Sequence, residues 1–156
     1  MLAKFMLAAT ILLTLIPALE AADKSPNQIL GGKPAMSGGA GRYYDGRGAF
    51  SGRSSASGNS TSLYGSQGSY AGRVEAGKSS TKLYDGKGGY EGRTQTSGNS
   101  TSFYDSKGAY NGRSTTSGSA TRFYDAKGAY SGRSETTGNT TRFYDAQGRY
   151  SGSKQK

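Results

Sequence analysis

Apolar and aromatic residues recur along this chain at a fixed interval of twenty residues. The segments that begin at residues 101, 121 and 141 read TSFYDSKGAYNGR, TRFYDAKGAYSGR and TRFYDAQGRYSGS. Six such copies fill residues 42–152, and they begin at Arg42, Ser62, Lys82, Ser102, Arg122 and Arg142. A constant period of this size is typical of repeat proteins, in which each copy contacts the next.

Each copy contains two turn signals. The first is YDAKG at 124–128, where Asp starts a turn and Gly supplies the positive φ that closes a type I turn with a bulge. The second is TSGN at 96–99. The runs between them are rich in Thr, Tyr, Phe and Ser, which favour strands. We therefore expect an all-β chain of tandem 20-residue hairpins, stacked as an extended sheet or a short β-solenoid.

The faces of these strands follow from alternation. If residues 125–128 form the loop, Phe123 lies opposite Tyr130 and shares its face, while Tyr124 points to the other face. A register that differs by one residue would exchange these roles. With the first register, stacked copies place one Tyr per copy in a ladder: Tyr44, Tyr64, Tyr84, Tyr104, Tyr124 and Tyr144.

A single copy cannot fold alone. Two buried aromatic side chains contribute at most about 10 kcal/mol, whereas ordering twenty residues costs roughly 30 kcal/mol. The copies must therefore cover one another, and the spacing stays constant so that equivalent residues meet in neighbouring copies.

The N-terminal region has the layout of a secretory signal peptide. Lys4 precedes an apolar run that Pro17 interrupts, and small residues follow, so we place cleavage after Ala21. An uncleaved membrane anchor is the alternative. The predicted organisation is a signal peptide at 1–21 with an N-terminal helix, a Gly/Pro-rich lead-in at 22–41, the repeats at 42–152 and a basic tail at 153–156. Export predicts a periplasmic, cell-surface or extracellular location.

Catalytic chemistry is sparse in this composition. The chain has no His and no Cys, so the commonest general base, nucleophile and transition-metal ligands are missing. We predict no enzyme activity, no catalytic residues, no cofactor and no metal. The repeated turn Asp is interpreted as a cap. A ladder of Ca²⁺ sites is the alternative, but Ca²⁺ prefers several carboxylates and each turn carries one.

Charge is the strongest functional signal. The net charge is +10, and one phase of the repeat carries Arg in five copies: Arg53, Arg73, Arg93, Arg113 and Arg133. Such a line of cations suits an acidic polymer. Together with the Tyr ladder, these Arg residues are our candidate ligand-binding residues. The alternative interpretation is a set of solvated charges that keep a sheet soluble.

The segment FYDAKGAYSGRSETTGNTTRFYDAQGR resembles the YD repeats of bacterial Rhs-type and wall-associated proteins. The resemblance covers residues 42–152 and implies β-hairpins in a spiralling sheet. Long arrays in that family close into a shell around a toxin or serve as surface and carbohydrate-contacting modules, and six copies are too few for such a shell. Small secreted proteins with Phe-Tyr-Asp repeats are labelled fibronectin-binding or adhesin-like. The chain also resembles choline-binding wall repeats, but those repeats rely on Trp cages and this chain has no Trp.

Three functions remain open. The first is a secreted or surface binding module, adhesin-like, that contacts acidic polysaccharide, lipopolysaccharide or a host matrix protein. The second is a self-assembling structural protein of amyloid-like character. The third is a repeat scaffold without a binding role. An export signal argues against a dedicated nucleic-acid target.

Overall fold

The computed structural model describes residues 40–156, and this part of the chain forms twelve antiparallel strands. The predicted signal peptide, its helix and nearly all of the lead-in lie outside the described residues. The strands are β1 (Gly41–Asp45), β2 (Phe50–Ser57), β3 (Ser60–Gly65), β4 (Tyr70–Ala76), β5 (Ser80–Asp85), β6 (Tyr90–Ser97), β7 (Ser100–Asp105), β8 (Tyr110–Ser117), β9 (Ala120–Tyr124), β10 (Tyr130–Thr137), β11 (Thr140–Asp145) and β12 (Tyr150–Gln155). The prediction of an all-β chain built from repeated hairpins is confirmed.

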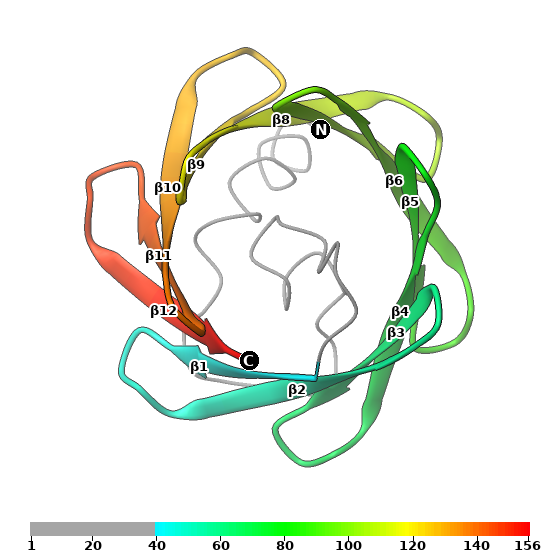
Figure 1. The fold of residues 1–156 in the computed structure, drawn as a ribbon. Helices are drawn as coiled ribbons and strands as arrows, with labels where there is room; N and C mark the ends of the chain where they lie inside the picture. Colours follow the sequence, from blue (N-terminus) through cyan, green and yellow to red (C-terminus); the bar gives the residue numbers. More distant parts are fainter. Residues whose placement is uncertain (1–39) are drawn as a thin grey trace, which may run out of the picture.

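The sheet closes on itself. Every strand pairs with its neighbours in sequence, and β1 pairs with β12 from Arg42↔Gln155 to Asp45↔Gly152 (Figure 1). The expected extended sheet or short β-solenoid is therefore wrong, because the twelve strands close into a barrel. Each of the six hairpins from β1–β2 to β11–β12 contains a bulge, and bulges increase local twist and bending. Closure also pairs the edges of the first and last strands. The last strand includes Ser153 to Gln155, which the sequence assigned to a tail.

The Asp-to-Gly turns form as the sequence predicts. In the fifth copy, the amide of Gly128 donates to the carbonyl of Asp125 at 3.0 Å, and the amide of Asp125 donates to the carbonyl of Ala129 at 2.9 Å. The Asp125 carboxylate accepts from the amides of Lys127 and Ala129 at 2.9 and 2.8 Å. Gly128 has φ +83°. These contacts make Asp a cap that satisfies two loop amides.

The Gly-Asn turns join strands at the other end of the barrel. Ser97 pairs with Ser100 across a two-residue loop whose first residue, Gly98, has φ +55°. Hairpin turns of the primed types require this positive value. The carbonyl of Asn99 accepts a hydrogen bond from the amide of Thr116 at 2.8 Å. This bond ties each such loop to the following copy.

The assignment of side chains to faces differs from our first register. The loop takes in Ala129, so Tyr124 lies opposite Tyr130, and Ser131 is an extra residue that leaves Phe123 opposite Gly132. Tyr124 and Tyr130 therefore share the outer face, whereas Phe123 points inward and is 0 % exposed. The loop length and the bulge together shifted the register by one residue.

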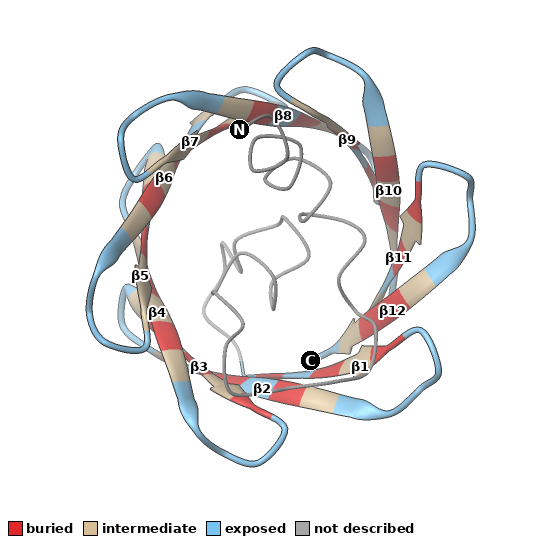
Figure 2. Cartoon of the chain, turned by 180° about the vertical axis from the view of Figure 1, so that it is seen from behind, coloured by how far each residue is buried: buried red, intermediate tan, exposed pale blue. Residues whose placement is uncertain are grey.

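Buried residues recur on the strands all around the barrel (Figure 2), and along each strand they alternate with the outward-facing residues, which places them on the inner face. Every copy buries the residue at the Phe/Leu/Tyr position, and the second copy also buries Val74. The residues at the repeated position are Tyr43, Leu63, Leu83, Phe103, Phe123 and Phe143. Ser and Thr side chains share the inner face with these residues. The hydroxyls of Thr96 and Thr101, for example, lie 3.0 Å apart. The Arg and Tyr side chains of the candidate site lie instead on the outer wall, the outward face of the strands.

Candidate functional site

The carboxylates of the turn Asp residues accept hydrogen bonds from backbone amides of their own turns. The Asp45 Oδ1 atom accepts from the amides of Arg47 and Ala49 at 2.9 and 2.8 Å, and the other turn Asp residues make the same pair of bonds. Among residues 40–156, no group of three or more His, Cys, Asp or Glu side chains could hold a metal ion. This part of the chain also contains no helix long and apolar enough to cross a membrane.

The outer wall carries a repeated group of three side chains. Arg113 on β8 lies opposite Tyr124 on β9, and its guanidinium carbon is 4.6 Å from the centre of the Tyr124 ring. The Tyr124 ring also packs against Tyr130 on β10 in a T-shaped arrangement, with ring centres 6.1 Å apart and planes at 71°. We call this set an Arg–Tyr–Tyr unit. A guanidinium over the face of an aromatic ring is attracted to that ring, and this attraction favours the observed position of the Arg side chain.

Five units surround the barrel. The five distances from guanidinium to ring centre are 4.1–4.6 Å, and the outermost ring of each unit is 40–44 % exposed. The units are Arg53–Tyr64–Tyr70, Arg73–Tyr84–Tyr90, Arg93–Tyr104–Tyr110, Arg113–Tyr124–Tyr130 and Arg133–Tyr144–Tyr150. The structure thus brings together each predicted Arg with a predicted Tyr of the next copy.

The sixth position lies where β1 meets β12, a pairing that we call the seam. Tyr44 meets Phe50 edge-on at 6.1 Å, but Ser153 occupies the place that Arg holds in the other copies. Tyr44 is therefore the one predicted Tyr without a stacked Arg. The second, more exposed Tyr of each unit was not among the predicted site residues, because only the bulge brings it to the outer face.

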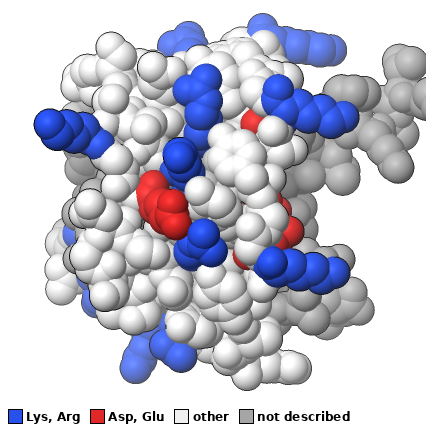
Figure 3. All heavy atoms as spheres, turned by 90° about the vertical axis from the view of Figure 1, so that its right-hand side faces the viewer, with Lys and Arg blue, Asp and Glu red and all other residues white. Residues whose placement is uncertain are grey.

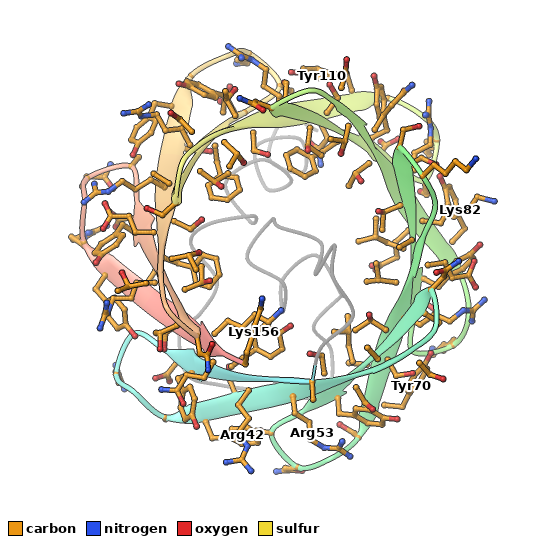
Figure 4. All side chains as sticks on the ribbon, viewed as in Figure 1. Arg42, Arg53, Tyr70, Lys82, Tyr110 and Lys156 are labelled. Atoms are coloured by element: carbon orange, nitrogen blue, oxygen red, sulfur yellow. The ribbon has the colours of Figure 1, made fainter. Side chains whose placement is uncertain are left out.

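Like charges lie directly opposite each other on three hairpins. The pairs are Arg42 with Arg53, Lys82 with Arg93, and Arg122 with Arg133. Figure 4 shows Arg42, Arg53 and Lys82 outside the wall, and Figure 3 shows Lys and Arg projecting from the face that carries β4–β6. Like charges in this arrangement destabilise a sheet. Fold stability alone does not account for them.

Two of the five units contain an ion pair. The Nε atoms of Arg73 and Arg133 lie 2.9 and 2.8 Å from carboxylate oxygens of Glu75 and Glu135. Hydrogen bonding to Glu75 raises the pKa of Arg73, and the same bond lowers the pKa of Glu75. Exposed pairs contribute little to stability, but each one neutralises a cation of the outer wall.

The side chains on the inner side of the seam differ from those at the equivalent positions of the other copies. Tyr43 replaces the Phe or Leu of other copies, and its hydroxyl lies 3.4 Å from the Ser54 hydroxyl. Burial raises the pKa of Tyr43 to about 12. The Lys154 ammonium lies 5.6 Å from the centre of the same ring. A pocket of about 460 Å³ lies nearby, but its cations do not converge, because Arg42 and Arg53 point outward and Lys156 points inward (Figure 4).

Glu91 is an exception among the acids. It occupies the bulge position that Ala71 holds in the second copy, where Ala71 packs against the buried cluster of Tyr43, Leu63 and Val74. One carboxylate oxygen of Glu91 is buried without a hydrogen-bond partner. Burial, together with repulsion by Asp85, raises the pKa of Glu91 to about 7.

This raised pKa predicts a pH dependence of stability. A carboxyl with a higher pKa in the folded chain binds more protons there than in the unfolded chain, so stability falls as pH rises from 4.5 towards 7. We expect Glu91→Gln to raise the melting temperature at pH 8 and to leave it nearly unchanged at pH 4. Thermal unfolding of both proteins across this range tests it, and a loss of stability at pH 8 would contradict it.

Comparison with models of known protein families found no match for this chain, and no curated protein matched its sequence. The likeness to YD repeats remains a resemblance in sequence pattern. Any inference about function must therefore be drawn from the geometry of the outer wall.

Proposed function

We propose that this protein is a non-catalytic binding module whose outer wall binds an acidic polysaccharide. The observation that supports the proposal is the set of five stacked Arg–Tyr–Tyr units at the same height on the wall. Export from the cell, which the N-terminal sequence predicts, would bring this surface into contact with extracellular or cell-surface glycans.

The chemistry of one unit suits a charged sugar. A guanidinium binds sulfate, phosphate or carboxylate through paired hydrogen bonds, and the exposed Tyr ring beside it offers a flat surface for the apolar face of a sugar. One such contact is weak. A polymer that contacts several units at once gains affinity through multivalency.

The arrangement of strands weighs against self-assembly by strand addition. Each strand within residues 41–155 pairs with two neighbours, so assembly through edges would first require the seam to open. Lipopolysaccharide shares the anionic chemistry of the proposed ligand and serves as a second probe. A host matrix protein would be recognised by contacts that do not depend on acidic sugars.

The test is binding of heparin, as a densely charged acidic polysaccharide, at several salt concentrations. We expect affinity to fall steeply with salt, because each neutralised charge releases a counterion. Changing all five unit Arg residues to Ser should weaken binding at physiological salt by at least about tenfold and flatten the salt dependence. Ser153 shows that the strand accepts Ser at this position.

A matched control separates charge from geometry. Replacing the same five Arg residues with Lys keeps the charge but removes the planar group, so we expect the salt dependence to persist while affinity falls less than in the Ser variant. Circular dichroism checks that each variant keeps its β structure. Absence of heparin and lipopolysaccharide binding by the wild-type protein at low salt would overturn the proposal.

A further inference from the structure

The five Arg–Tyr–Tyr units differ in the residue that lies two positions after Arg. Arg73 and Arg133 are each paired with Glu at that position. Arg93 instead meets the neutral Gln95 at 3.3 Å, and Arg113 meets the hydroxyl of Thr115 at 3.4 Å. Two units are thus internally neutralised, and the two units between them are not.

The strands between the two Glu residues carry Arg93 and Arg113, the two unit Arg side chains that meet a neutral partner in place of an acid. Strands β5, β6, β8 and β9 present Lys82, Arg93, Arg113 and Arg122 on the outward face. Lys82 lies opposite Arg93 on one side and Glu75 on the other, and Arg122 lies opposite Thr115 and Arg133. We call this part of the outer wall the β5–β9 sector. Glu75 on β4 and Glu135 on β10 lie just outside it.

On the opposite side of the barrel, the series of Arg–Tyr–Tyr units is interrupted. It also carries outward cations, Arg142, Arg42 and Arg53, but Ser153 replaces Arg at the seam and Phe50 replaces the exposed Tyr. Only Arg53 belongs to a complete unit there. Within residues 40–156, the β5–β9 sector therefore holds both Arg residues of the one adjacent pair of complete units in which no Arg is paired with an acid.

We infer that the β5–β9 sector is the primary binding site on the wall, and that Glu75 and Glu135 limit binding to it. Arg93 and Arg113 lie two strands apart, which places them about 10 Å from each other along the wall. The ligand class is a linear acidic polysaccharide that carries sulfate or carboxylate groups at intervals of this order. This inference rests on the proposed function and adds the location and the residues that determine it.

Two double variants test the location. Arg93→Ser with Arg113→Ser and Arg73→Ser with Arg133→Ser remove the same number of charges and the same number of stacked guanidinium groups. We expect the first pair to weaken binding of a heparin-derived oligosaccharide by about tenfold and the second by less than about threefold, since Arg73 and Arg133 already hydrogen-bond to Glu75 and Glu135. Equal losses would overturn the inference and leave the proposed function intact.

A third variant tests the role of the acids. Glu75→Gln with Glu135→Gln frees two Arg side chains without altering any stacked ring, so we expect affinity to rise several-fold and to depend more steeply on salt. Because no Arg–Tyr contact is removed, this variant remains informative if an Arg variant destabilises the barrel. Unchanged affinity would overturn the inference, and absence of binding by the wild-type protein would overturn the proposed function with it.

Discussion

Replacing Gly112 with Ala should destabilise the barrel by about 3 kcal/mol. Gly112 follows the bulge on β8 with φ +126°, a conformation that other residues rarely adopt. A Cβ atom at this position would fall against the carbonyl oxygen of Tyr124 on the neighbouring strand. Because that oxygen belongs to the backbone of the sheet, the clash can be relieved only by moving two strands apart.

A second glycine of the same copy provides the control. Gly108 also has a positive φ, +82°, but no atom lies within 4 Å of a Cβ built there. We expect Gly108→Ala to cost about 1 kcal/mol, from backbone strain alone. Denaturant unfolding of both variants measures the difference. Equal effects would mean that the bulge does not bring the neighbouring strand as close as described.

Cross-linking the seam should stabilise the barrel by up to about 4 kcal/mol. Arg42 and Gln155 are exposed and lie opposite each other on β1 and β12. Directly opposed residues of antiparallel strands have Cα atoms about 5 Å apart, a separation that a disulfide spans. The chain has no Cys of its own, so Arg42→Cys with Gln155→Cys introduces one defined bond.

The redox state supplies the control for this variant. After oxidation, a closed barrel should yield a cross-linked monomer with a raised melting temperature, and reduction should return it to the wild-type value. In an open sheet, β1 and β12 would lie at opposite ends of the array. Oxidation would then produce cross-linked dimers and larger species, which a non-reducing gel would resolve from the monomer.

The hairpins were predictable because their determinants are local. Asp125 and Gly128 fix one turn through contacts that span four residues, and Gly98 fixes the other through its own φ. Both signals are visible in a single copy, and the regular spacing repeats them along the chain. Local chemistry is sufficient to set turn type and strand order.

The faces and the closure were not predictable in the same way. The loop and the bulge around Ser131 decide which aromatic residues share a face, and Gly132 was the available signal, since its φ of +137° suits only Gly. Closure depends on the accumulated twist and tilt of twelve strands. It also depends on a pairing between residues more than a hundred positions apart, which no local motif encodes.

The candidate site was predicted in part. The sequence identified Arg93 and Arg113 as members of a repeating line, but it treated all five Arg residues as equivalent. Their difference arises from residues two positions further along the same strand, which face the same side of a sheet. The positions of Glu75 and Glu135 beside Arg73 and Arg133 could have been predicted from that alternation once the outward face was known.

The central claim is that the outer wall, and not the inner face, contacts an acidic polysaccharide. The most direct measurement is a magnetic resonance titration of the labelled protein with a heparin-derived oligosaccharide at low salt, observing Arg Nε–H and aromatic ring signals. We expect the largest shift changes at Arg93, Arg113 and Tyr110, with the ring signals of the buried Phe103 and Phe123 unmoved. Changes confined to the inward-facing rings, or no saturable change at all, would contradict the account.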